Sequence, residues 1–451
     1  MKYIFILAVC ITALLSCKKF LDKKSNQKLV IPSTVQDLQG LLDSYARVNQ
    51  FNPGAAEKSA DDYYLTQPDW AALTTIPDQR IYTWEKDFLF VTGTNDWSNL
   101  FDNVYKANLI ITEMPNIPLS AGTLEQRNAC LGHAYFIRAN SFLQGLAIWS
   151  PAYDQATAST DLGMPLRLDP EFNSPSVRSS VKQSYEQVLK DAKQAAALLP
   201  ETALHLLRPC KPAALALVAR TYLFMGNYDS CLYYSDWALS IKNNIKDYNQ
   251  LNASTTYPFD PRFSNPEVLY DCYTATGSIL NNSRAKIDSN LYRSYHANDL
   301  RKTIFFRNNN NGTYGFRGSY SGVINLFNGF AVDELYLMKA ECEARKNNAM
   351  EAMNTLNTLL IKRWKTGTFI PYTAATKEEA VEKILLERRK ELLMRSIRWI
   401  DIKRLNKQGA SISLTRILGS NTYLLPPNDL RFALPIPETV IELTGMVQNP
   451  R

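Results

Sequence analysis

Two loop-rich stretches of the chain carry aromatic and polar side chains that no helical period explains. The first stretch spans residues 51–96, and the second spans residues 243–330, where Asn, Ser, Tyr and Gly are frequent. Flat aromatic faces stack on a ligand while amides and charged groups hydrogen-bond to it, and a glycan would require both kinds of contact. The candidate ligand contacts are Tyr63, Tyr64, Trp70, Arg80, Trp84, Tyr273, Tyr314, Phe316 and Tyr320.

Trp70 and Trp84 are the strongest of these candidates, because neither belongs to a periodic helical segment. The competing interpretation of every aromatic residue is a place in the core, since aromatic side chains bury a large apolar area. Four other tryptophans lie on periodic helical segments, where we expect core positions: Trp97, Trp149, Trp237 and Trp399.

No motif supports a catalytic site. The chain has three histidines and lacks the HExxH, GxSxG and phosphate-loop patterns. A glycosidase needs two carboxyl groups at a defined separation, and among 43 acidic residues a pair in the sequence carries no information. The pair Asp61-Asp62 is too little to predict a calcium site. We therefore expect no catalytic residue, no metal and no cofactor, and an α-helical surface glycosidase is kept only as an alternative.

The first seventeen residues predict the location of the protein. Lys2 precedes an apolar run over residues 3–15, which is shorter than the ~20 residues that span a bilayer. Residues 1–16 are therefore predicted to be a secretory signal. The sequence Leu-Leu-Ser-Cys at its end is typical of a bacterial lipobox, so we expect Cys17 to be acylated and residues 17–30 to be a tether. An ordinary signal followed by a chance cysteine is the alternative.

The composition is that of a folded protein. Of 451 residues, 45% are hydrophobic and 21% are charged, which excludes a disordered chain or a protein with many membrane spans. The net charge of +7 comes from scattered basic residues, so no basic patch indicates nucleic-acid binding. Five cysteines remain after the signal and Cys17, and an odd number without CxxC spacing favours neither disulfides nor zinc.

Helical periodicity dominates the rest of the chain. It predicts helices over 97–114, 124–149 and about 180–199, and one helix over 376–405 that begins with a Thr376/Glu379 capping box. Residues 213–239 place small and aromatic residues as a tetratricopeptide repeat does, and 333–364 form a weaker pair. The sequence therefore predicts a mostly α protein. A tetratricopeptide-like scaffold over about 97–242 and 331–407 would support an irregular ligand-binding half with few short β-strands.

Motifs in a shared order along the chain resemble the SusD/RagB family of Bacteroidetes outer-membrane lipoproteins. They include Phe20-Leu21-Asp22 after Cys17, the segment HAYFIRANSFLQGLAIWS, the hairpin 213–239, the stretch ERRKEL with RWID at 387–401, and Pro435-Ile436-Pro437. The family usually has Glu-Gly where this chain has Arg395-Ser396. Local packing there, and any ion pair built on the usual acid, should therefore differ.

The resemblance implies a single SusD-like domain over residues 31–451 and a role without catalysis. Such proteins are lipid-anchored in the outer membrane, face the cell exterior and sit on a SusC-like TonB-dependent β-barrel transporter. They capture an oligosaccharide, or sometimes a peptide, and deliver it to the barrel for nutrient uptake and polysaccharide utilisation. The alternative is a tetratricopeptide-type scaffold that binds proteins. The helical repeats are expected to face the transporter.

Overall fold

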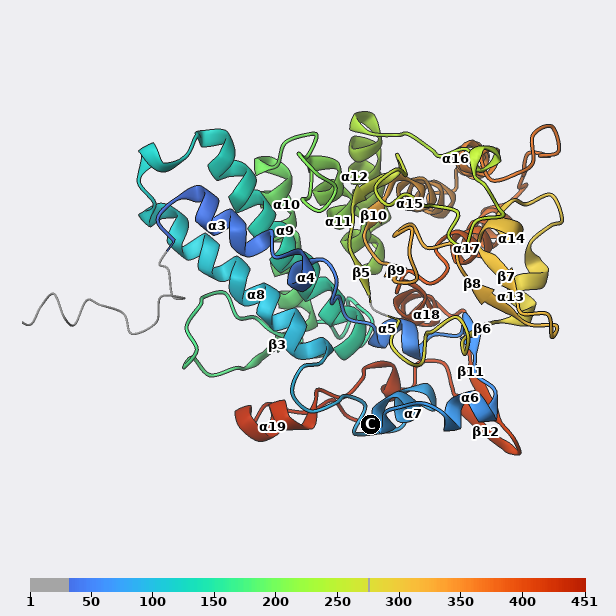
Figure 1. Ribbon diagram of the computed structural model, residues 1–451, viewed down its shortest axis with the longest axis horizontal. Helices are drawn as coiled ribbons and strands as arrows, with labels where there is room; N and C mark the ends of the chain where they lie inside the picture. Colours follow the sequence, from blue (N-terminus) through green and yellow to red (C-terminus); the bar gives the residue numbers. More distant parts are fainter. Residues whose placement is uncertain (1–31, 275) are drawn as a thin grey trace, which may run out of the picture.

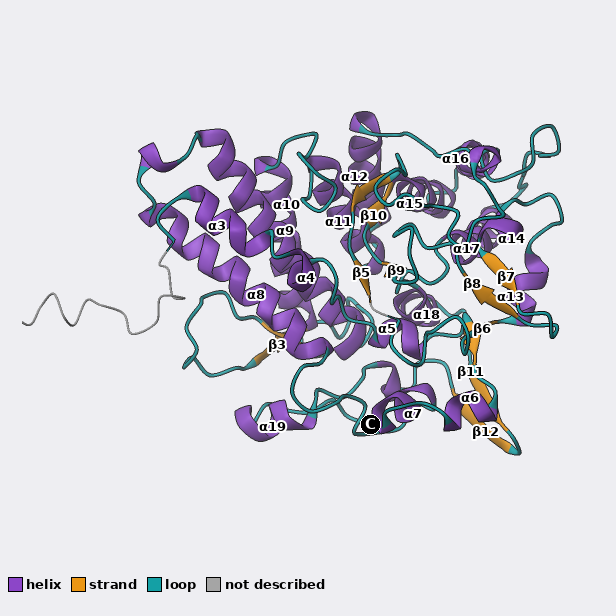
Figure 2. Cartoon of the chain, in the orientation of Figure 1, coloured by secondary structure: helices purple, strands orange, loops and turns teal. Residues whose placement is uncertain are grey.

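The computed structural model describes residues 32–274 and 276–451, so Cys17, the predicted signal and the predicted tether lie outside the described residues. Within these ranges the regular structure is mainly α-helical, and the strands form short antiparallel pairs (Figure 2). This confirms the predicted fold class. No helix of the described ranges combines the length and the apolar run that crossing a membrane requires.

Long helices pack against one another in chain order and form the scaffold (Figure 1). Their starts follow from capping, because Thr123 and Ser180 each accept a hydrogen bond from the backbone amide three residues later. Gly226, with φ of 72°, makes the turn between the two helices of the predicted tetratricopeptide-like pair. The scaffold helices are α8 (Asp96–Glu113), α9 (Leu124–Trp149), α10 (Val181–Leu198), α11 (Lys211–Phe224), α12 (Tyr228–Ile241), α15 (Val332–Arg345), α16 (Ala349–Leu360), α17 (Lys377–Glu391) and α18 (Arg398–Lys407).

Shorter helices and strand pairs make up the rest of the described chain. The helices are α3 (Val35–Leu42), α4 (Tyr45–Val48), α5 (Ala55–Ser59), α6 (Gln67–Ala71), α7 (Ile76–Tyr82), α13 (Ser289–Ser294), α14 (Arg301–Ile304) and α19 (Glu438–Thr444). The strand pairs are β1 (Tyr63–Tyr64) with β6 (Lys286–Ile287), β2 (Leu162–Pro165) with β3 (Arg178–Ser180), β4 (Val268–Tyr270) with β10 (Phe330–Ala331), β5 (Tyr273–Thr274) with β9 (Leu326–Phe327), β7 (Phe306–Asn308) with β8 (Tyr314–Phe316), and β11 (Leu414–Leu418) with β12 (Asn421–Leu425). Pairs such as β1–β6 join segments that lie far apart in the sequence. Among these elements, α3, α4 and the β2–β3 pair pack against the scaffold helices α8, α9 and α10.

The predicted single helix over 376–405 is wrong. The chain leaves the helix after α17 and resumes it as α18, and Met394 and Ser396 between them have φ of 58° and 59°. Tertiary contacts hold this turn. The Arg395 guanidinium donates to both carboxylate oxygens of Asp333 on α15, at 3.0 and 2.7 Å, and the Ser396 amide donates to Glu57 of α5 at 2.7 Å. Apolar spacing continues through the turn, so periodicity could not reveal it.

Buried ion pairs join the scaffold to the irregular half. Arg363, fully buried, donates to Glu267 at 2.8 Å and to Glu391 of α17 at 2.7 Å. Arg301 of α14, also fully buried, reaches Glu391 at 2.9 Å and Glu387 at 2.5 Å. Further buried pairs extend the network through the scaffold: Arg220–Glu334, Arg388–Asp401, Arg395–Asp333 and Arg404–Glu341.

We predict that Arg363→Met lowers the free energy of unfolding by about 3–5 kcal/mol, because it leaves two buried carboxylates without their shared cation. Urea titration followed by circular dichroism measures the change. The control is Lys346→Met, which removes an exposed partner of Asp229 and should leave the transition midpoint unchanged. Equal midpoints for both variants would show that the network does not stabilise the fold.

Candidate functional site

The strand pair β1–β6 brings the two predicted loop stretches together. Tyr64 lies directly opposite Lys286, and Tyr63 lies opposite Ile287. Residues opposite each other in an antiparallel pair point to the same face, and neighbours along a strand point to opposite faces. Tyr63 and Ile287 are accordingly buried in the core, while Tyr64 is half-buried on the outer side of the pair.

Helix α6 holds Trp70 beside this strand pair. The Thr66 hydroxyl caps the helix by accepting from the Asp69 amide, and the ammonium of Lys286 donates to the Asp69 carboxylate at 2.5 Å. The Trp70 indole donates to the Gln79 carbonyl of α7 at 3.1 Å, which fixes the ring while leaving it half-buried. The Asp69–Lys286 pair therefore ties helix α6, which carries Trp70, to the strand opposite Tyr64.

Strand β8 packs against β6 and adds a second aromatic group. Tyr314 of β8 stacks on Tyr292 of α13, with ring centroids 3.6 Å apart and an interplanar angle of 15°. Both rings are half-buried, and the Lys302 ammonium lies 5.0 Å from the Tyr292 centroid. We call the group Tyr64, Asp69, Trp70, Lys286, Tyr292 and Tyr314 the β1–β6 face.

Arg80 is half-buried, but its guanidinium is already engaged. It forms an ion pair with Asp87, and it also donates to the Asp87 carbonyl at 2.8 Å. Its Cζ lies 5.9 Å from the ring centroid of Phe88, which is 58% exposed. Arg80 thus shapes the loop after α7 and has limited capacity for a ligand.

The structure places Trp84 in the core rather than on a ligand face, which corrects the prediction for this residue. Its indole is 1% exposed and donates to the Ser59 carbonyl at 3.0 Å. The Arg416 guanidinium of β11 lies 4.8 Å from the Tyr63 centroid, 4.2 Å from that of Tyr82 and 5.3 Å from that of Trp84. Trp84 and Tyr63 are therefore used to enclose a buried cation.

Tyr273, Phe316 and Tyr320 are also buried, which again corrects their placement on an open face. Tyr320 has a structural role, because its hydroxyl lies 3.0 Å from carboxylate oxygens of both Glu267 and Asp333. Burial raises the pKa of Tyr320 well above its usual value, and the two carboxylates add to this effect. The second loop stretch therefore contributes Tyr314 alone from the predicted aromatic set to the β1–β6 face.

Asp69, Lys286 and Tyr292 of the face were not predicted. A local signal existed, since Thr66-Gln67-Pro68-Asp69 and Thr75-Ile76-Pro77-Asp78 share a capping Thr, a Pro and an Asp, and each begins a short helix. The pairing of Lys286 with Asp69 and the stacking of Tyr292 depend on contacts between distant segments, which the sequence pattern does not specify.

The outer side of α12 carries exposed aromatic side chains. Trp237 is 40% exposed, so its predicted core position is wrong, whereas Trp97, Trp149 and Trp399 are buried as predicted. Tyr233 beside it is 62% exposed, and the Tyr233 and Trp237 centroids lie 6.1 Å apart. Exposed aromatic clusters of this kind often mark contact surfaces for another molecule.

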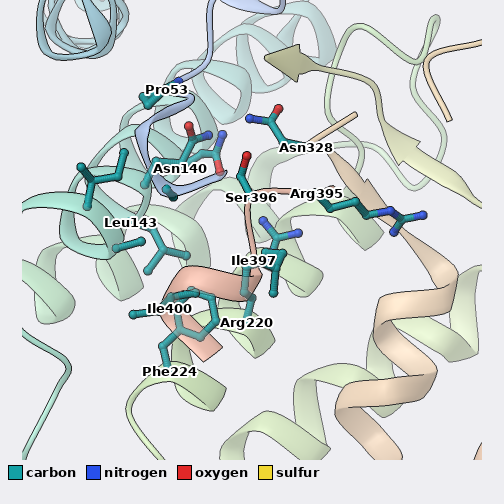
Figure 3. A pocket seen from close by; sticks show the side chains of 14 residues that line it. Pro53, Asn140, Leu143, Arg220, Phe224, Asn328, Arg395, Ser396, Ile397 and Ile400 are labelled. Carbon is teal, nitrogen blue, oxygen red and sulfur yellow. The ribbon is translucent and has the colours of Figure 1, made fainter. Parts of the chain in front are cut away.

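A small, mainly apolar cavity lies between α5, α9, α11 and the turn before α18, and it is too small for a sugar (Figure 3). Its volume of about 40 Å³ has room for about one water molecule. Arg220 and Arg395 line it, but each guanidinium is already paired with a buried carboxylate. The unpartnered Oδ1 of Asn140 is well placed to accept a hydrogen bond from such a water.

Glu267, Asp333 and Glu391 form a compact buried group of carboxylates, with oxygen atoms within 4.8 Å of one another. Arg363 pairs with Glu267 and Glu391, and Arg395 pairs with Asp333, so guanidinium groups already occupy the positions a metal ion would need. Burial and the nearby acids raise the pKa of Glu267 to about 7. These carboxylates therefore bind arginine side chains of the protein itself.

Comparison with known proteins identifies the family. Residues 19–223 match a family model described as starch-binding associating with outer membrane, and residues 240–451 match the model of the SusD family. No curated protein sequence matches the chain.

Solved structures share the fold at low sequence identity. A SusD superfamily protein from Bacteroides thetaiotaomicron VPI-5482 has a TM-score of 0.74 at 21% identity, covering 93% of this chain and 100% of that one. A SusD superfamily protein from Bacteroides vulgatus ATCC 8482 has a TM-score of 0.72 at 18% identity, covering 93% and 99%. A SusD-like carbohydrate binding protein from the same organism has a TM-score of 0.66 at 19% identity, covering 92% and 97%. The two family models together span most of the chain, and the protein belongs to the SusD family.

Proposed function

We propose that this protein is a non-enzymatic, lipid-anchored subunit of an outer-membrane uptake complex that captures a carbohydrate and delivers it to a SusC-like TonB-dependent barrel. The observation that carries the proposal is the family match over both halves of the chain, one half of it to a model described as starch-binding. A structural relative described as carbohydrate binding adds support. We also propose that residues 31–451 form one domain, because β1 pairs with β6 across the two matched halves.

The β1–β6 face is our proposed contact surface for the carbohydrate. Trp70 and the Tyr292–Tyr314 pair offer aromatic surface, and Asp69, a partly exposed carboxylate paired with the buried Lys286, can accept hydrogen bonds from hydroxyls. Hydrogen bonds within the protein fix Trp70 and Asp69 before a ligand arrives, which lowers the entropy lost on binding. A peptide is the second ligand class, since aromatic and charged groups would suit it too.

The exposed aromatic side chains of α12 suit contact with another protein. We propose that this surface contacts the barrel. It lies on the scaffold rather than on the β1–β6 face, so ligand and barrel could contact the protein at the same time. The same surface would serve the alternative function, a scaffold that binds other proteins. The experiments below separate the two, because only uptake requires a carbohydrate as well.

We predict that Trp70→Ala combined with Tyr314→Ala weakens carbohydrate binding at least tenfold, about 1.4 kcal/mol. Full-length protein in detergent would be tested by affinity electrophoresis against a panel of polysaccharides that includes starch. Wild-type protein should be retarded by at least one of them. The matched control is Trp237→Ala, a half-exposed tryptophan outside the face, and melting curves would verify folding. Equal retardation of the double variant would reject this face as the binding site.

We predict that the protein, tagged at its carboxyl end, co-purifies with a barrel of the TonB-dependent class from mildly solubilised outer membranes of its host. Mass spectrometry identifies the partner and its stoichiometry. Tyr233→Asp with Trp237→Asp should abolish recovery of the barrel, because it puts charge on the proposed contact surface. Leu443→Asp on α19, at a position 87% exposed, is the control and should recover it. Recovery with every variant would place the barrel elsewhere on the protein.

We predict that Cys17→Ser releases the protein from the membrane fraction, because serine cannot form the thioether to lipid. Sedimentation of membranes followed by immunoblotting measures the distribution. An unchanged membrane-bound fraction in the variant would contradict acylation of Cys17.

A further inference from the structure

A larger cavity lies apart from the β1–β6 face, where α18, the loop after α9 and the C-terminal segment meet. Its volume is about 330 Å³, which equals the space of roughly ten water molecules in the liquid. Its floor includes Lys403, Phe432, Ala433 and Asn449, each less than 9% exposed. Its rim includes the exposed Thr160.

Lys403 is the unusual member of this cavity. It is 3% exposed, and its ammonium donates to the carbonyls of Ala147 and Ser150, at 2.8 and 2.5 Å, at the carboxyl end of α9. No carboxylate of the described chain pairs with it, whereas the buried Arg301 and Arg363 each have at least two. Burial lowers the pKa of Lys403 to about 7, and an anion beside it would oppose that shift.

Lys403 supplies the spare hydrogen-bond donor on the cavity floor. An ammonium has three N–H bonds, and two carbonyls use two of them. The other floor amides are satisfied: Asn449 bonds to two carbonyls and to Arg178, and both side-chain atoms of Asn406 bond to the backbone of Ile412. The floor thus offers one cationic donor surrounded by the apolar surface of Phe432 and Ala433.

The other charged groups lining the cavity leave this donor available. Asp429 is paired with Arg431 at 2.9 Å, and Asp161 accepts the Thr157 hydroxyl at 2.6 Å. Lys407 is exposed at the rim, where its ammonium lies 3.7 Å from the carboxylate of Asp154. The negative charge of Asp161 would repel an anion in the cavity. Asp161 is partly exposed, however, and solvent screens its charge.

We propose that this cavity binds a small carboxylate-bearing molecule, with the carboxylate on the Lys403 ammonium and the apolar part of the molecule against Phe432. A monosaccharide acid is small enough to enter a cavity of this volume. Binding would give the buried ammonium the anionic partner that the protein itself does not provide.

Calorimetric titration of full-length protein in detergent tests the proposal. The probes are D-glucuronate, D-galacturonate, N-acetylneuraminate and succinate, with D-glucose and D-galactose as neutral controls. At least one acid should bind ten times more tightly than the neutral sugars, and Lys403→Met should remove this preference. Trp70→Ala should retain it, which separates this cavity from the β1–β6 face.

Lys403 also stabilises the end of α9, so a second variant keeps the test decisive if Lys403→Met fails to fold. Thr160→Trp places a large ring at the exposed rim and should weaken binding of the acid at least tenfold. Its control is Ser159→Trp, an exposed neighbour that does not line the cavity, which should bind as wild type does. The proposal is overturned if no acid binds more tightly than the neutral sugars, or if Thr160→Trp binds the acid unchanged.

Discussion

Charged groups buried between the helical scaffold and the irregular half are the constraint on which this structure depends. Removing a carboxylate and a guanidinium from water costs several kcal/mol each, and the cost is offset only when geometry and hydrogen bonds are nearly complete. Arg404, which is bidentate on Glu341, and Arg301, which is bound to three acids, meet this condition, whereas Nη1 and Nη2 of Arg388 have no hydrogen-bond partner among the described residues. Tyr320 joins this network, because its hydroxyl lies 3.0 Å from carboxylate oxygens of both Glu267 and Asp333 and 2.8 Å from the Tyr248 hydroxyl.

The same chemistry positions the proposed binding face. Arg389 of α17 donates to Asp62 at 2.9 Å, and Arg398 of α18 donates to Asp61 at 2.7 Å. The Asp62 carbonyl in turn accepts from the Asp288 amide at 2.9 Å, directly beside the β1–β6 pair. The scaffold therefore holds the start of β1 through two ion pairs, and an irregular segment acquires a defined position without a large sheet. Binding residues on loops that a rigid framework orients are a common arrangement.

The sequence allowed the helical scaffold to be predicted, but it did not reveal which aromatic side chains are buried and which are exposed. Helical periods and capping residues are local, so α8, α9 and α10 were predicted close to their observed bounds. Trp70 and Trp84 are alike in the sequence, since neither has a helical period. They differ in burial because the Trp84 ring packs against the buried guanidinium of Arg416, which lies more than 300 residues away along the chain. The predicted core position of Trp237 was wrong for the opposite reason, because the period of a helix does not reveal which of its sides remains exposed to solvent.

The turn at Arg395-Ser396, where the family resemblance led us to expect Glu-Gly, shows how a buried arginine is accommodated. A buried arginine needs a carboxylate, and Asp333 on α15 supplies both oxygens to it. The turn also needs left-handed backbone at Ser396, where glycine would be unstrained, and the amide of this residue is held by Glu57. Burial and the nearby Asp62 and Asp61 raise the pKa of Glu57 to about 8, so at neutral pH this carboxyl is mainly protonated and adds little negative charge beside Asp61 and Asp62. Arginine at this turn is thus compatible with the fold only because α15 carries its acid, and the pair Asp333–Arg395 must be understood as one unit.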